Sequence, residues 1–134
     1  MPFQSSSPHI ELGKLGETTV ANHLKRKHYK ILSQNYRKKC GELDLVTEKA
    51  GVVHFFEVKS VSYETDRRNF LGNTWLPEEN VDHRKVKKLL RTIEIWLLEH
   101  KCTAEWQLDV ASVWIDRKEK KGRIKIIENI TGSV

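Results

Sequence analysis

The chain has 134 residues, enough for one domain over residues 1–134 with a hydrophobic core that needs no disulfide bonds. Its 24 Lys and Arg residues exceed its 18 Asp and Glu residues, and the net charge of +6 favours a polyanionic partner such as nucleic acid or an anionic surface. Because no apolar run is long enough to cross a membrane and residues 1–7 lack the apolar core of a signal peptide, we expect a cytoplasmic protein with no membrane partner.

The first predicted element is a helix that begins at Pro8, with Ser7 as its N-cap, and ends near Lys27. Residues 1–7 before it are expected to be flexible. One face of this helix carries residues at helical spacing, namely Leu12, Leu15, Thr19 and Leu24. The chain therefore opens with a helix that has one face suited to packing.

Three strands are predicted next, over residues 29–37, 41–46 and 52–59. Only a short turn separates the last two, so we expect an antiparallel hairpin in which Gly51 adopts the positive φ angle of a tight turn. Residues 60–79 show no sustained period and predict a long loop. A loop of that kind inside a small domain is usually functional or mobile.

A second helix is predicted to begin after Asn80, its N-cap, because apolar residues follow the helical period closely from there. These residues are Val86, Leu89, Leu90, Ile93, Trp96 and Leu97. Two strands follow, over residues 107–115 and 123–127, with the charged run 117–122 as the loop between them. We find no internal repeat or linker that would divide the chain.

Charged residues interrupt the apolar strands of the predicted hairpin: Asp44 lies in its first strand, and Glu57 and Lys59 lie in its second. Burying a carboxylate or an ammonium group is costly unless the group is paired or holds a metal ion. Because strand residues alternate between faces, Glu57 and Lys59 share a face, and the hairpin brings Asp44 beside Glu57. Two neighbouring carboxylates repel unless a cation lies between them, so the pattern indicates a metal site.

Oxygen ligands of this kind suit Mg²⁺, for which Mn²⁺ can substitute, and the main-chain carbonyl of Val58 can add a ligand. Lys59 cannot bind a metal ion, but its ammonium group can orient or deprotonate an attacking water, or stabilise charge on a phosphate. A metal ion that polarises a phosphate and activates water is a common route to phosphodiester hydrolysis. The alternative is that Glu57 and Lys59 are an exposed acid and base on an edge strand.

The residues of this pattern resemble a known family in their order along the chain. They are Gly16-Glu17, Asn35-Tyr36-Arg37, Gly41-Glu42-Leu43-Asp44-Leu45-Val46, Phe56-Glu57-Val58-Lys59, Lys85-x-x-Lys88-Leu89 and Leu108-Asp109-Val110. From Gly13 to Ile130 the chain resembles the YraN-type predicted endonucleases of the PD-(D/E)xK nuclease superfamily, which are similar to archaeal Holliday-junction resolvases. The resemblance implies that Glu17, Asp44 and Glu57 bind the divalent metal and that Lys59 serves the water.

The resemblance also implies the fold. We expect an α/β protein with a single-domain restriction-endonuclease-like fold, in which a mixed sheet of about five strands is flanked by helices in the order α-β-β-β-α-β-β. The first three strands would form a meander, and the active site would lie at one end of the sheet. A homodimer follows from the resolvase analogy alone, because cutting a two-fold junction needs two sites.

Five basic residues decorate the first half of the second helix and are candidates for contact with nucleic-acid phosphates: Arg84, Lys85, Lys87, Lys88 and Arg91. The alternative is a solvated basic face. Phe70 and Trp75 in the long loop either stack on bases or fold back onto the core.

Other polar residues have simpler explanations. Glu42 is expected to cap a turn or to pair with Arg37, and Asp109 to orient a basic residue rather than to take part in catalysis. Cys40 and Cys102 lack the spacing of a metal site and are expected to be reduced. Five of the six histidines lack it too and are expected to fill positions at the surface or in the core: His23, His28, His54, His83 and His100.

We therefore expect a Mg²⁺-dependent endonuclease that hydrolyses phosphodiester bonds in DNA, above all branched or structured DNA in repair or recombination. The alternative is a nucleic-acid-binding module on the same fold with little or no cleavage activity. A nuclease directed at RNA is also compatible with these residues.

Overall fold

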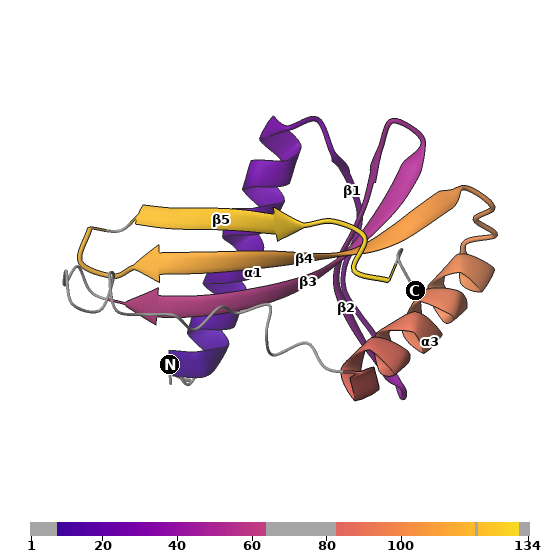
Figure 1. The fold of residues 1–134 in the computed structure, drawn as a ribbon, viewed down its shortest axis with the longest axis horizontal. Helices are drawn as coiled ribbons and strands as arrows, with labels where there is room; N and C mark the ends of the chain where they lie inside the picture. The colour runs from indigo at the N-terminus through magenta and orange to yellow at the C-terminus, as the bar shows by residue number, and fades with distance from the viewer. Residues whose placement is uncertain (1–7, 64–82, 120, 132–134) are drawn as a thin grey trace, which may run out of the picture.

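The computed structural model describes residues 8–63, 83–119 and 121–131. In these residues, five strands form one mixed sheet in the order β1-β2-β3-β4-β5, flanked by two helices (Figure 1). The elements are α1 (Pro8–Arg26), β1 (Lys30–Lys38), β2 (Gly41–Lys49), β3 (Val52–Tyr63), α3 (His83–Glu99), β4 (Glu105–Asp116) and β5 (Lys121–Ile127). The predicted single-domain α/β fold and its α-β-β-β-α-β-β order are confirmed, and the arrangement is consistent with a restriction-endonuclease-like fold.

The first three strands form the predicted antiparallel meander. The turn between β2 and β3 places Ala50 and Gly51 at φ angles of 52° and 80°. Two successive positive φ angles are what a two-residue hairpin turn needs to match the twist of its strands, so the prediction for Gly51 is confirmed. In β1 the pairing shifts between Ile31 and Ser33, which leaves Leu32 as an extra residue in the strand.

The second half of the sheet depends on a parallel pair. β3 and β4 are paired in parallel from Val52–Glu105 to Tyr63–Asp116, and α3 is part of the crossover that connects them. β4 lies between β3 and β5 and is buried on both faces from Leu108 to Val113, which explains why its sequence alternates only weakly in polarity.

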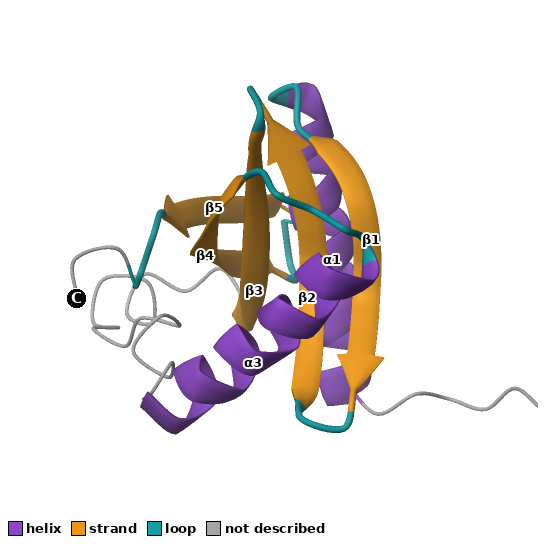
Figure 2. Ribbon diagram, turned by 90° about the vertical axis from the view of Figure 1, so that its right-hand side faces the viewer, coloured by secondary structure: helices purple, strands orange, loops and turns teal. Residues whose placement is uncertain are grey.

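The two helices cover opposite faces of the sheet, with α3 in front of the strands and α1 behind them in Figure 2. On the α1 face, one core cluster consists of Val20, Ala21, Leu24, Leu45, Phe56, Ala111, Val113 and Ile115. On the α3 face, the other consists of Leu43, Val46, Val53, Phe55, Leu89, Ile93, Trp96 and Leu108. Each fully buried large side chain stabilises the fold by about 1.5–3 kcal/mol. Both faces of β2 and β3 are therefore held firmly.

Some boundaries differ from the sequence prediction, and some predicted features lie outside the described residues. β3 continues to Tyr63, past the predicted start of the loop at residue 60, because β4 pairs with it along its whole length. The rest of the predicted loop, with Phe70 and Trp75, lies outside the described residues, as do residues 1–7 and the two predicted N-caps.

β5 begins at Lys121, inside the run predicted as a loop, because the turn after β4 is shorter than expected. The Asp116 carboxylate closes this turn by accepting the main-chain N–H groups of Lys118 and Glu119 at 3.0 and 3.2 Å. Neither described helix is long and apolar enough to cross a membrane.

Helix α1 approaches the sheet most closely at Gly16. A Cβ atom built on Gly16 would lie 1.8 Å from Ser60 Oγ and 3.0 Å from Ser60 Cβ. The first of these distances is shorter than any that real Cβ atoms show. Ser60 Oγ is buried and has no hydrogen-bond partner among the described residues, so packing alone holds this contact. Gly16 therefore determines how closely α1 packs on β3, and so helps to position the next residue, Glu17.

We expect Gly16→Ala to lower the free energy of unfolding by about 1–3 kcal/mol, because the added methyl group overpacks the contact with Ser60. Gly13 lies in the same helix and has open space around it, so Gly13→Ala is the matched control and should stabilise by up to about 1 kcal/mol through helix propensity. Urea denaturation measures both. Equal stability of the two variants would contradict the close contact.

Candidate metal site

The candidate site lies where β2 and β3 separate. Their pairing runs from the turn as far as Leu45–Phe56, and Asp44 and Glu57 are the next residues on the two strands. Beyond the last pair, the Asp44 side chain reaches across to β3, where Oδ2 accepts the main-chain N–H of Val58 at 2.8 Å. The opening of the ladder thus places two carboxylates side by side at one end of the hairpin.

The environment of Asp44 disfavours its charged form. Burial raises the pKa of Asp44 to about 8, and the nearby charge of Glu57 adds to the shift. The hydrogen bond from Val58 lowers the pKa but does not offset the other contributions, which include the charges of Glu17 and Glu42. Four carboxylates from three elements therefore interact around Asp44.

Glu17 enters this cluster from α1 and is held there by Asn35 of β1. With its amide nitrogen facing the carboxylates, Asn35 donates to Glu17 Oε1 at 2.8 Å and to Glu42 Oε1 at 3.2 Å. Burial and the charge of Glu42 are the main causes that raise the pKa of Glu17. Asn35 has a φ angle of 51°, in the left-handed region that Asn tolerates better than most residues.

The role of Asn35 was not predicted from the sequence, although the residue belongs to one of the motifs there. The sequence offered one indication of this role: Asn tolerates the left-handed backbone conformation, and its amide group can donate two hydrogen bonds. Glu42 was expected to pair with Arg37, and this contact is confirmed at 3.4 Å from Arg37 Nε to Glu42 Oε2. The structure adds that Glu42 also belongs to the acidic cluster, since its charge raises the pKa of both Glu17 and Asp44.

Two lysines face the buried carboxylate of Glu57, which is 6% exposed. Lys85 Nζ on α3 lies 2.7 Å from Glu57 Oε1, and Lys59 Nζ on β3 lies 3.4 Å from the same oxygen. Burial lowers the pKa of Lys85, but its hydrogen bond with Glu57 leads the opposing causes and the net shift is upward. Burial and then the neighbouring Lys85 lower the pKa of Lys59, so Lys59 gives up its proton more readily than a surface lysine.

The structure separates Lys85 from the other predicted phosphate contacts. Lys85 is directed into the site, whereas four basic residues of the same helix are exposed: Arg84, Lys87, Lys88 and Arg91. Their contact with nucleic acid stays a prediction. The structure does place this exposed basic set on the helix whose first turns border the carboxylates.

The carboxylates of Glu17, Asp44 and Glu57 are not drawn tightly together in this conformation. Among the described residues, the one group of three metal-ligand side chains with all ligand atoms within 4.8 Å is His54, Asp109 and Glu128. Side-chain rotation would be needed for Glu17, Asp44 and Glu57 to share an ion. Glu57 in particular is turned toward Lys85.

The group of His54, Asp109 and Glu128 could hold a metal ion, but hydrogen bonds already satisfy its buried members. Asp109 Oδ2 lies 2.8 Å from His54 Nδ1, and its Oδ1 accepts Gln107 Nε2 at 2.9 Å and the main-chain N–H of Asn129 at 2.8 Å. These bonds tie β3, β4 and the chain after β5 together. The prediction that Asp109 orients a basic residue is confirmed, and His54 is a bonded member of that network rather than a simple filler of the core.

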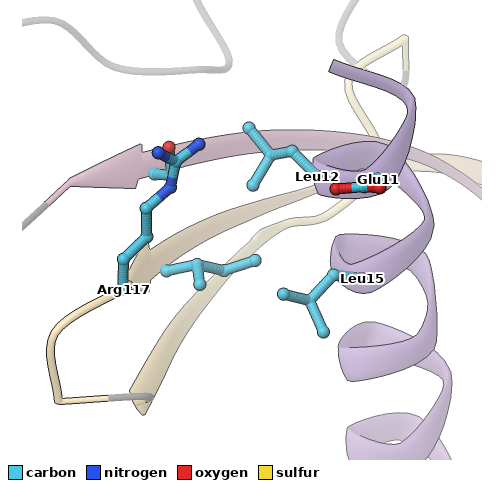
Figure 3. Close-up of a pocket in the computed structure, with 6 residues that line it drawn as sticks. Glu11, Leu12, Leu15 and Arg117 are labelled. Atoms are coloured by element: carbon cyan, nitrogen blue, oxygen red, sulfur yellow. The ribbon is translucent and has the colours of Figure 1, made fainter. Parts of the chain in front are cut away.

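One described cavity, of about 340 Å³, lies beside the first turns of α1 and is separate from the carboxylates. Figure 3 shows Glu11 and Arg117 on its two sides, with Leu12 and Leu15 on the α1 wall. Ser62 and Ile115 complete the lining. None of the carboxylates of the acidic cluster lines this cavity, so it does not bear on the metal site.

Residues 16–113 match the model of the uncharacterised protein family UPF0102. The chain belongs to this family. A UPF0102 protein of Campylobacter lari is 34% identical over 121 residues, covering 89% of this chain and 92% of the relative. Another, from Persephonella marina, is 34% identical over 87 residues, covering 65% of this chain and 68% of the relative. The UPF0102 match spans all four carboxylates of the cluster and both lysines that face Glu57.

The raised pKa of Asp44 predicts that, without metal, the free energy of unfolding of this UPF0102 chain decreases as pH rises. The folded state binds a proton at Asp44 up to about pH 8, whereas the unfolded chain releases it near its ordinary value of 3.8. The stabilising contribution of the bound proton therefore declines as pH rises between these values. Asp44→Asn removes this titration and retains an oxygen that can accept from Val58.

In EDTA, we expect the difference in melting temperature between Asp44→Asn and wild type to increase steadily from about pH 5 to pH 8. At pH 8 the variant should melt about 5 °C above wild type. Thermal denaturation followed by circular dichroism measures this difference. Glu105→Gln, at an exposed position at the start of β4, is the control and should show no such trend. A difference that is constant with pH would argue against a protonated Asp44.

Proposed function

We propose that this UPF0102 chain is a divalent-metal-dependent endonuclease that hydrolyses phosphodiester bonds in DNA. One observation carries the proposal: Glu17, Asp44 and Glu57, from three different elements, interact electrostatically where β2 and β3 separate, and burial and the charge of Glu57 raise the pKa of Asp44 to about 8. Like charges gathered in a partly buried position are costly unless a cation neutralises them. A divalent cation would stabilise the ionised forms of these carboxylates, including that of Asp44, which burial and Glu57 disfavour in its absence.

The chemistry of this donor set fits Mg²⁺, with Mn²⁺ as a substitute. All the side-chain donors are carboxylate oxygens, which hard cations prefer, and the carbonyl of Val58 lies on β3 between Glu57 and Lys59. We assign Glu17, Asp44, Glu57 and the Val58 carbonyl as ligands. When bound, the ion would supply polarisation of the phosphate and a more acidic water.

Lys59 is the residue we assign to the attacking water. Its ammonium group lies beside Glu57, and burial together with Lys85 lowers its pKa. A lysine with a lowered pKa exchanges a proton near neutral pH more easily than an ordinary one. Lys59 can then orient the water, accept its proton or stabilise charge that develops on the phosphate.

The partner we propose is DNA, bound through its phosphates. The net charge of +6 and the four exposed basic residues of α3, Arg84, Lys87, Lys88 and Arg91, provide a cationic surface beside the carboxylates. Such contacts position the backbone without reading the sequence. A preference for branched or structured DNA, and action as a homodimer, are supported only by the resemblance to the Holliday-junction resolvases.

We expect cleavage of labelled DNA in the presence of Mg²⁺ or Mn²⁺ and none in EDTA. The panel consists of a four-way junction, a flap, a single strand and a linear duplex, with the branched forms cut fastest. Asp44→Ala and Lys59→Ala should each reduce the rate by at least about 100-fold, as loss of a metal ligand or of a proton-transfer group does. Lys118→Ala, in the exposed turn after β4, is the control and should leave the rate unchanged.

Failure to cut any substrate with either metal, together with unchanged DNA binding in Asp44→Ala and Lys59→Ala, would contradict the enzyme and favour a nucleic-acid-binding module. Cleavage of structured RNA in place of DNA would change the substrate and leave the site intact. Binding that is indifferent to salt between 50 and 200 mM would remove α3 as a phosphate-binding surface, since each phosphate contact steepens the dependence.

A further inference from the structure

Among the described residues, the basic group nearest to the buried carboxylate of Glu57 is the ammonium group of Lys85. Lys85 Nζ lies 2.7 Å from Glu57 Oε1, nearer than Lys59 Nζ at 3.4 Å, and both ammonium groups use the same oxygen. Lys85 comes from α3, on the sheet face opposite α1, and its side chain is 36% exposed while that of Glu57 is 7% exposed. The ion pair therefore joins a buried anion to a cation that still reaches solvent.

A divalent cation bound to either oxygen of the Glu57 carboxylate would lie close to the Lys85 ammonium group, which is at hydrogen-bond distance from Oε1. The two positive charges would repel strongly in a partly buried position. We infer that Lys85 holds the place of the cation against Glu57 in the metal-free protein and is displaced from Glu57 when a divalent cation binds. This inference rests on the proposed function, because it takes Glu57 as a ligand.

The displaced ammonium group has a defined direction in which to move. Lys85 and Lys88 are three residues apart on α3, so their side chains lie on the same side of the helix, and Lys88 is exposed. The flexible four-carbon stem of lysine lets the charge move outward without any change in the backbone. Lys85 then joins the exposed basic residues of α3 and gains access to a DNA phosphate.

Metal and DNA binding are coupled by this exchange. A cation that frees Lys85 adds one phosphate contact, and DNA that binds Lys85 removes the competitor for Glu57. By thermodynamic linkage, each ligand then raises the affinity for the other by the same factor. Lys85 is a positioning residue in this scheme, and its effect is visible in binding without any turnover.

The first test measures Mn²⁺ binding by calorimetry at pH 8 without DNA. We expect Lys85→Met to bind Mn²⁺ about 5- to 100-fold more tightly than wild type, because the competing ammonium group is gone and Glu57 lacks a strong counter-ion. Lys88→Met is the matched control, because it removes an exposed charge from the same helix. Its affinity for Mn²⁺ should equal that of wild type. Lys85→Gln keeps a donor for Glu57 without the charge and should follow Lys85→Met even if the methionine variant folds poorly.

The second test measures the salt dependence of DNA binding with Ca²⁺ in place of Mg²⁺ to suppress cleavage, and again in EDTA. With Ca²⁺, the slope of log K against log salt should be shallower by about 0.9 in Lys85→Gln than in wild type, which is the loss of one phosphate contact. In EDTA the two slopes should agree. Lys88→Met should be shallower than wild type by the same amount in both conditions.

Equal Mn²⁺ affinity of wild type, Lys85→Met and Lys85→Gln would overturn the displacement of Lys85 while leaving the metal site and the nuclease proposal standing. A lower Mn²⁺ affinity in both Lys85 variants would also overturn the displacement, because it would mean that Lys85 favours binding of the ion. No Mn²⁺ binding in any variant would refute the metal site itself, and with it both proposals. A slope difference that is the same in Ca²⁺ and in EDTA would refute the coupling alone.

Discussion

The pairing of β2 and β3 stops one residue short of two carboxylates, and the rest of the site follows from that break. Up to Leu45–Phe56 the strands are joined by the ladder and by core side chains on both faces. Beyond it, the bond from the Val58 N–H to Asp44 takes over. Asp44 and Glu57 lie inside their strands, and the apolar clusters on the two faces of the sheet keep the backbone of this opening in place.

The three carboxyl groups proposed as metal ligands are held by three different kinds of partner. Asp44 is held by a main-chain N–H, Glu17 by the amide of Asn35, and Glu57 by the two ammonium groups. Neutral donors orient a carboxyl group without supplying a positive charge, so a bound cation would favour the ionised forms of Glu17 and Asp44. The acid supplied by α1 and the base supplied by α3 reach the site from opposite faces of the sheet. Two helices on opposite faces of the sheet thus each contribute a side chain at the point where β2 and β3 separate.

A contact of the candidate site could be predicted from the sequence only when its two residues are close together in the chain. The strand patterns marked Asp44, Glu57 and Lys59 because charge in an apolar strand is visible locally, and the hairpin turn fixed which of them are neighbours. The contact of Lys85 with Glu57 and the bond of His54 to Asp109 join residues from different elements, so no local period reports them. Asn35 was missed for the same reason. The full length of β3 was missed because its final residues are ordered by β4, which the local composition does not reveal.

The contact between Gly16 and Ser60 has a consequence for how chains of this kind can change in length. Each residue inserted into a helix turns everything on one side of it by about 100° relative to the other side. An insertion between Gly16 and the buried Val20 would rotate Gly16 off β3 and carry Glu17 away from Asn35. An insertion before Gly16 moves neither. Within α1, the contacts of Gly16 with Ser60 and of Glu17 with Asn35 therefore tolerate a change in length only on the N-terminal side of Gly16.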